Sequence, residues 1–133
     1  MPGSSLWLLP PTDHPLRDVI PSLIDKTSKK FNSPHRFLPH VTLTSEISPS
    51  AYGSNPQAWL DSLAFPAGQD VRVTFERLGS DEAFFRKLYI KCEKNEGVKK
   101  LAKQCRQQVN GFEEEAKALI WANDQYMPHL SLM

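Results

Sequence analysis

The feature that most constrains the fold is a seven-residue phrase that occurs twice, 89 residues apart. The copies read FLPHVTL at residues 37–43 and YMPHLSL at residues 126–132. In a β-strand, alternate side chains point to opposite faces. The copies therefore predict two strands, near 40–44 and near 129–132. In each strand, aliphatic residues on one face would pack inward, and the opposite face would carry the polar residues. That face carries His40 with Thr42, or His129 with Ser131.

The remaining chain predicts short strands and helices in an α+β order within a single domain, residues 1–133. Asn55 and Asn95 are expected to cap helices, as is Thr12 or Asp13. The charged residues of the last helix, Arg106 among them, are expected to face solvent. The expected elements are strand 4–9, helix 15–31, strand 41–44, helix 56–63, an antiparallel hairpin of strands 71–76 and 84–92, helix 96–112 and strand 129–132.

Composition limits what the chain can bind. It has 133 residues, enough for a hydrophobic core, and 16 Lys and Arg against 15 Asp and Glu. The net charge of +1 gives no general attraction to nucleic acid or an acidic membrane, so an anionic ligand must be held locally. Cys92 and Cys105 do not form a CxxC pair and are expected to be reduced and structural.

The N-terminal apolar run is short. LWLL at residues 6–9 precedes two prolines, too short for a signal peptide or a membrane span. We therefore expect a soluble, intracellular protein, cytoplasmic or endomembrane-associated.

The repeated residue types suit a particular chemistry. Two imidazoles facing one cavity can act as acid and base, and two hydroxyls can bind the oxygens of a tetrahedral anion. This combination favours opening of a cyclic phosphate. A metal centre is disfavoured because neither phrase contains a second ligand, and no GxSxG or phosphate-binding glycine loop is present. We expect no metal and no cofactor.

A family resemblance extends this interpretation. HVTL at 40–43 and HLSL at 129–132 resemble the paired H-x-[ST]-x motifs of the 2H phosphoesterase superfamily. The chain is similar over nearly its whole length to fungal and plant cyclic phosphodiesterases of tRNA splicing, through LWLLPP at 6–11, FLP at 37–39 and FFRKLY at 84–89. The resemblance implies a metal-independent enzyme with a two-lobed, pseudo-symmetric α+β fold, whose antiparallel sheets line a central cleft.

The resemblance also implies substrates and residue roles. ADP-ribose 1″,2″-cyclic phosphate would be opened to ADP-ribose 1″-phosphate, and nucleoside 2′,3′-cyclic phosphates to 2′-phosphates. His40 and His129 would be the acid and base, and Thr42 and Ser131 would hold phosphate oxygens. We assign His129 as base and His40 as acid, although a near-symmetric site can exchange the roles. Because the chain ends at Met133, we expect the second lobe to be incomplete.

Other residues and functions stay open. The aromatic candidates for stacking on a base or ribose, with core packing as the alternative, are Trp7, Phe84, Tyr89 and Tyr126. We expect a monomer that binds a small cyclic phosphate nucleotide, without a membrane or extended nucleic acid. One alternative is an RNA-end enzyme of this superfamily, acting on 2′,5′ linkages or oligonucleotide termini. Another is a noncatalytic nucleotide-binding remnant.

Overall fold

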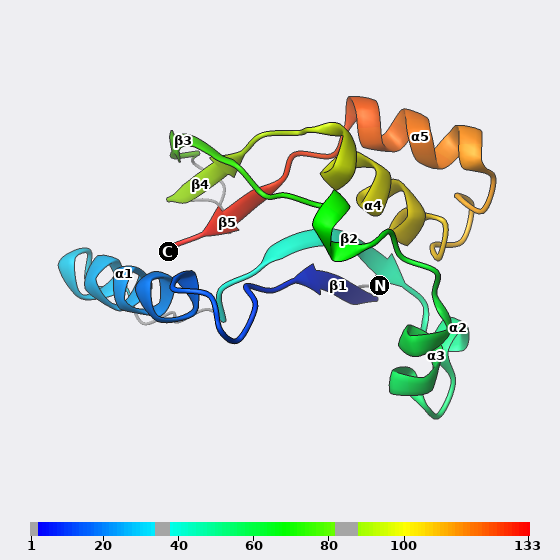
Figure 1. The fold of residues 1–133 in the computed structure, drawn as a ribbon, viewed down its shortest axis with the longest axis horizontal. Helices are drawn as coiled ribbons and strands as arrows, with labels where there is room; N and C mark the ends of the chain where they lie inside the picture. The colour runs from blue at the N-terminus through cyan, green and yellow to red at the C-terminus, as the bar shows by residue number, and fades with distance from the viewer. Residues whose placement is uncertain (1–2, 34–37, 82–87) are drawn as a thin grey trace. The chain divides into compact units, whose positions relative to one another are not determined.

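The computed structural model describes residues 3–33, 38–81 and 88–133 (Figure 1). Helices and antiparallel strands are mixed along the chain, so the predicted α+β class is confirmed. The strands are β1 (Ser4–Leu8), β2 (Val41–Ile47), β3 (Phe75–Gly79), β4 (Tyr89–Cys92) and β5 (His129–Ser131). The helices are α1 (Leu16–Lys30), α2 (Pro49–Tyr52), α3 (Pro56–Ser62), α4 (Glu96–Arg106) and α5 (Glu115–Asp124), with a 3₁₀ turn at Gly68–Asp70.

Among the described residues, the five strands form one sheet in the order β1-β2-β5-β4-β3. β5 pairs antiparallel with β2 on one side and with β4 on the other, and β4 pairs antiparallel with β3. Both copies of the repeated phrase are therefore confirmed as strands, and they are neighbours in the sheet. The predicted hairpin of β3 and β4 is also confirmed. The cleft that the resemblance implies stays a prediction.

The chain divides into two compact units, each assembled from three segments. The first comprises residues 1–6, 43–73 and 94–126, and the second comprises residues 7–42, 74–93 and 127–133. All four motif residues, His40, Thr42, His129 and Ser131, belong to the second unit. Their geometry can therefore be described within that unit alone.

Asparagine side chains begin two of the helices, as predicted. Asn55 Oδ1 accepts a hydrogen bond from the Ala58 amide at 3.1 Å, and Asn95 Oδ1 accepts one from the Val98 amide at 3.0 Å. α1 lies where a helix was predicted, but the predicted cap at Thr12 or Asp13 is wrong, because the N-cap is Pro15, whose side chain makes no hydrogen bond. The residues before it form a turn in which the His14 amide donates to the Pro11 carbonyl.

The helix predicted over 96–112 is shorter than expected. α4 ends at Arg106, and a second helix that the sequence pattern did not predict, α5, begins at Glu115, after the predicted range. Gly111 lies between them with φ +94, a backbone conformation that glycine adopts readily and other residues rarely. Lys103 Nζ forms an ion pair with Glu115 Oε1 at 2.7 Å across this turn.

The prediction that Arg106 faces solvent is wrong, because the residue is 7% exposed. Its guanidinium carbon lies 4.2 Å from the ring centroid of Phe112 and 4.6 Å from that of Trp121. Nη1 donates to Thr44 Oγ1 at 3.2 Å, and Glu46 supplies an opposite charge at 3.6 Å. A guanidinium is weakly hydrated and stacks on aromatic faces, which makes this burial tolerable. Desolvation lowers the pKa of Arg106, and the charge of Glu46 opposes that change.

The strand predicted over 71–76 begins only at Phe75. Val71 and Val73 pack instead against a buried hydrophobic cluster that includes two residues of α4. Between them, the carbonyl of Arg72 accepts a hydrogen bond from Asn95 Nδ2 at 2.8 Å. Val71 and Val73 are half-buried as predicted, whereas Phe75 is 38% exposed.

The two cysteines are free and buried, in agreement with the expected structural role. Burial, with a smaller effect from Glu76, raises the pKa of the Cys92 thiol to about 11. Burial raises the pKa of the Cys105 thiol to about 12. Both thiols are therefore protonated near neutral pH. Within the described residues, no helix has the length and apolar character needed to cross a membrane.

We predict that Asn95→Ala lowers the free energy of unfolding by about 1 kcal/mol, because the Val98 amide loses its capping acceptor. Urea denaturation followed by circular dichroism measures the change. Asn95→Asp keeps the acceptor and should lose less. Asn55→Ala, at the exposed start of the shorter α3, is the matched control and should lose less than Asn95→Ala. Equal stability of Asn95→Ala and the wild type would contradict the prediction.

Candidate functional site

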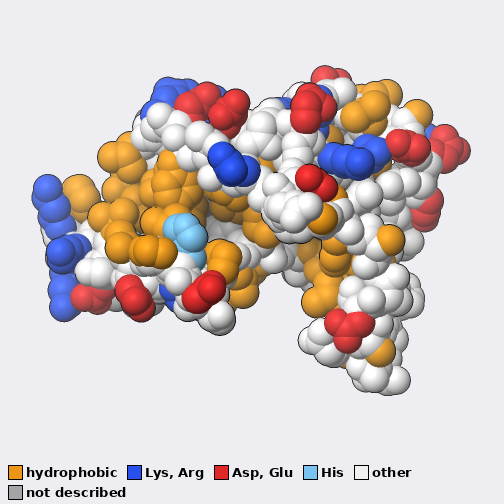
Figure 2. All heavy atoms as spheres, in the orientation of Figure 1, with side chains coloured by type: hydrophobic (Ala, Val, Ile, Leu, Met, Phe, Trp, Pro, Cys, Tyr) orange, Lys and Arg blue, Asp and Glu red, His pale blue; other side chains and the backbone are white. Residues whose placement is uncertain are grey.

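The motif residues alternate between the two faces of the sheet. Val41, Leu43, Leu130 and Leu132 are buried, whereas Thr42, His129 and Ser131 between them are half-buried. His40, directly before β2, is also half-buried. The burial pattern therefore agrees with the predicted alternation: the aliphatic residues anchor each strand, and the histidines and hydroxyls occupy the more accessible positions. In Figure 2, a histidine side chain is visible at the surface among hydrophobic side chains.

The register of β2 with β5 relates the two motifs to each other. Val41 is paired with Leu130 in an antiparallel ladder. Continuing this register by one residue in each direction sets Thr42 opposite His129 and His40 opposite Ser131. Directly opposite residues have Cβ atoms about 4.5–5.5 Å apart, and diagonal ones are about 7–8 Å apart. On this register, the hydroxyl of the other motif would lie across from each histidine, and the two imidazoles would be diagonal.

Both imidazoles are held by the same local hydrogen bond. His40 Nδ1 lies 2.6 Å from the Leu38 carbonyl oxygen, and His129 Nδ1 lies 2.9 Å from the Met127 carbonyl oxygen. A carbonyl oxygen only accepts, so Nδ1 must be the protonated nitrogen in both rings. Nε2 is consequently the nitrogen that can gain or lose a proton in chemistry.

Sequence reasoning missed the two anchoring carbonyls, although a signal for them exists. Each belongs to the residue two before the histidine, with a proline between, Pro39 or Pro128. Proline fixes its own φ and favours an extended residue before it. The repeated proline therefore matters for how each imidazole is held, as well as for where the strand begins.

Aromatic rings contact both histidines. Trp7 of β1 stacks on His40, with ring centroids 3.7 Å apart and an interplanar angle of 13°. Tyr89 of β4 meets His129 edge to face, with centroids 5.4 Å apart and an angle of 69°. Gly79 makes room for the tyrosine, because a Cβ there would lie 2.6 Å from Cζ of the Tyr89 ring. Trp7 and Tyr89 thus support the imidazoles directly.

The other two aromatic candidates are placed differently or not described. Tyr126 is 7% exposed and packs in the buried cluster with Val98 and Ala102, its ring 5.3 Å from that of Trp121. It belongs to the first unit, whereas the motif residues belong to the second. Phe84 lies outside the described residues.

Metal-binding side chains do not gather in the parts of the chain that the structure describes: no group of three His, Cys, Asp or Glu residues there could hold an ion. The metal-independent site stays a prediction. What the described geometry offers is two oriented imidazoles and two hydroxyls on one face of a two-strand ladder.

The whole chain, residues 1–133, matches the family model described as cyclic phosphodiesterase-like protein. A 2′,3′-cyclic-nucleotide 3′-phosphodiesterase of Phaeosphaeria nodorum is 62% identical over 133 residues, covering 100% of this chain and 69% of the relative. The enzyme of the same name from Neurospora crassa is 41% identical over 151 residues, covering 100% and 71%. That of Yarrowia lipolytica is 28% identical over 158 residues, covering 98% and 72%.

We predict that the neutral forms of His40 and His129 are both the Nδ1–H tautomer, because each Nδ1 faces a carbonyl. Long-range ¹H–¹⁵N NMR correlation spectra distinguish the tautomers. His14 is an internal control with the opposite geometry: its Nδ1 accepts a hydrogen bond from the Leu16 amide at 3.1 Å, so its neutral form should be Nε2–H. An Nε2–H signature at His40 or His129 would contradict the site geometry.

Proposed function

Because the chain belongs to the cyclic phosphodiesterase-like family, we propose that it opens ribose cyclic phosphates by a two-histidine acid–base mechanism. The substrates we propose are nucleoside 2′,3′-cyclic phosphates, giving 2′-phosphates, and ADP-ribose 1″,2″-cyclic phosphate, giving ADP-ribose 1″-phosphate. The names of the Phaeosphaeria and Neurospora relatives support the first class. The observation that carries the mechanism is the matched anchoring of both imidazoles through Nδ1.

The reaction needs one proton removed and one delivered. A water oxygen attacks phosphorus while Nε2 of the basic histidine takes a proton from the water. The bond from phosphorus to the ribose 3′ oxygen breaks, and Nε2 of the acidic histidine protonates that oxygen. The product is the 2′-phosphate. Both steps use Nε2, the nitrogen that the Nδ1 hydrogen bonds leave for proton transfer.

The two hydroxyls position the phosphate between the imidazoles. Thr42 and Ser131 would donate hydrogen bonds to the nonbridging oxygens, where negative charge builds up as water attacks. Since each hydroxyl is opposite the other motif's histidine, the phosphorus would be centred in the four-residue group. A diagonal separation of about 7–8 Å between the histidine Cβ atoms leaves space for a phosphate with an imidazole on either side.

We assign His40 as the acid and His129 as the base. An indole face is a favourable neighbour for a cationic ring, and Trp7 stacks on His40 in this way. Trp7 is 47% exposed, so it remains our candidate for stacking on the base or ribose. Tyr89 is 7% exposed, which favours a role in supporting His129. We propose that the protein acts as a monomer on a small nucleotide, without a cofactor.

We predict that His40→Asn and His129→Asn each lower kcat for adenosine 2′,3′-cyclic phosphate by at least about a hundredfold, because each removes a proton-transfer group. Wild-type activity should persist in EDTA and follow a bell-shaped pH profile. His14→Asn is the control: it replaces a histidine that bonds its own turn and should keep full activity. Turnover that survives both site substitutions together would overturn the mechanism.

We predict that the product of adenosine 2′,3′-cyclic phosphate is adenosine 2′-phosphate alone, because only the bond to the 3′ oxygen is broken. ³¹P NMR and chromatography against both isomers identify it. Formation of the 3′-phosphate, or a preference for 2′,5′-linked oligonucleotides, would favour the RNA-end enzyme instead. Calorimetric binding of the cyclic nucleotide without any product would favour the noncatalytic alternative.

A further inference from the structure

A lysine is paired across the sheet with one of the proposed catalytic histidines. Lys91 of β4 is opposite His129 of β5, and Tyr89 is opposite Ser131. Opposite residues of a ladder point to the same face. Lys91 therefore shares the face that carries the imidazoles and hydroxyls, one strand further from β2.

The hydrogen bonds of the ladder set how close this lysine lies. The Cys92 amide donates to the Pro128 carbonyl at 2.9 Å, and the Leu132 amide donates to the Leu88 carbonyl at 2.9 Å. Hydrogen-bonded and non-hydrogen-bonded pairs alternate along an antiparallel ladder. Lys91 and His129 are thus a non-hydrogen-bonded pair, the type whose Cα atoms are about 4.5 Å apart and whose side chains are closest.

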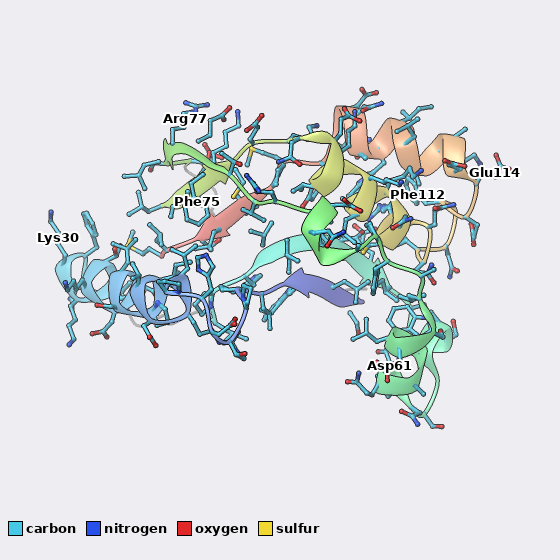
Figure 3. All side chains as sticks on the ribbon, viewed as in Figure 1. Lys30, Asp61, Phe75, Arg77, Phe112 and Glu114 are labelled. Atoms are coloured by element: carbon cyan, nitrogen blue, oxygen red, sulfur yellow. The ribbon has the colours of Figure 1, made fainter. Side chains whose placement is uncertain are left out.

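The ammonium group of Lys91 has an acidic partner on the neighbouring strand β3. Lys91 Nζ forms an ion pair with Glu76 Oε2 of β3 at 3.3 Å. The two side chains are 33% and 46% exposed, so the pair is weak and a bound anion can compete with the carboxylate. Glu76 lies between Phe75 and Arg77, where the β3–β4 register is irregular. Figure 3 labels these two neighbouring residues.

From this geometry we propose that Lys91 binds a second phosphate group of the substrate, separate from the cyclic phosphate, and so determines substrate preference. The inference rests on the proposed hydrolysis of cyclic phosphates. A phosphate on the 5′ side of the ribose, as a monophosphate or a diphosphate, has the required chemistry. Glu76 holds the ammonium in place in the free protein and gives it up to the substrate.

The reacting phosphate is the less suitable partner for Lys91. It would lie between β2 and β5, whereas Lys91 is on β4 and its charge is drawn toward β3. Neighbouring strands are about 4.8 Å apart, so the ammonium is more than one strand spacing from the centre of the four motif residues. A group several bonds from the cyclic phosphate matches this displacement.

The test compares adenosine 2′,3′-cyclic phosphate with the same compound carrying a 5′-phosphate or a 5′-diphosphate. Lys91→Met should lower kcat/KM for the 5′-phosphorylated substrates by about tenfold and leave that for the simple substrate nearly unchanged. Lys91→Arg should retain most of the preference for 5′-phosphorylated substrates over the simple substrate. Glu76→Gln should strengthen this preference, because the carboxylate that competes for the ammonium is gone. The 5′ group whose substrate loses more kcat/KM in Lys91→Met is the one that the site binds.

Lys29→Met is the matched control, because Lys29 also forms an ion pair, with Asp25 at 3.0 Å, but on α1. It should leave the preference unchanged. Equal losses for all substrates in Lys91→Met, or no loss for any, would overturn the proposal while leaving cyclic phosphate hydrolysis intact. Calorimetry with adenosine 2′,5′-bisphosphate and adenosine 2′-phosphate tests it without turnover: Lys91→Met must weaken only the first. Failure of the wild type to hydrolyse any cyclic phosphate contradicts the proposed function instead.

Discussion

The candidate site depends on the register of β5, a strand of three residues between β2 and β4. A slip by one residue would turn every side chain of a strand to the opposite face. His129 and Ser131 would then point toward the buried side, and Leu130 would be exposed. Burial of Leu130 and Leu132, at 2% and 1% exposure, opposes that slip, and backbone bonds to β4 fix the same register. The aliphatic face of the motif therefore determines where its chemical face lies.

Within that register, local backbone geometry defines which nitrogen of each imidazole is protonated. Two segments far apart in sequence reach the same arrangement: a carbonyl two residues before the histidine accepts from Nδ1, and a proline stands between. Because the hydrogen bond is formed within each segment, the tautomer does not depend on a distant partner. Residues distant in sequence instead orient the imidazole rings: Trp7 stacks on His40, and Tyr89 contacts His129 edge to face.

This division explains what could be predicted from the sequence. Strand alternation around His40 and His129 and the caps at Asn55 and Asn95 are short-range features, and the structure contains them. Arg106 was misplaced because helical periodicity treats any charged residue as exposed, whereas two aromatic rings from later in the chain enclose it. The partner strand of each motif, and hence Lys91, follows from pairing between distant segments, which periodicity cannot reveal.

The four motif residues at the centre of the site and Lys91 beside them would bind negative charge in different ways. A cyclic phosphodiester carries a single negative charge, so two neutral hydroxyls and one protonated imidazole can match the reacting group without a fixed cation. A permanent charge beside the phosphorus would hold substrate and product as well as the transition state, which raises affinity without raising kcat. One strand away, Lys91 can contribute binding energy through a part of the substrate that does not react. The net charge of the chain is only +1, so its selectivity for anionic substrates would come from the position of this one ammonium group. Glu76 holds the ammonium of Lys91 until the substrate phosphate replaces the carboxylate.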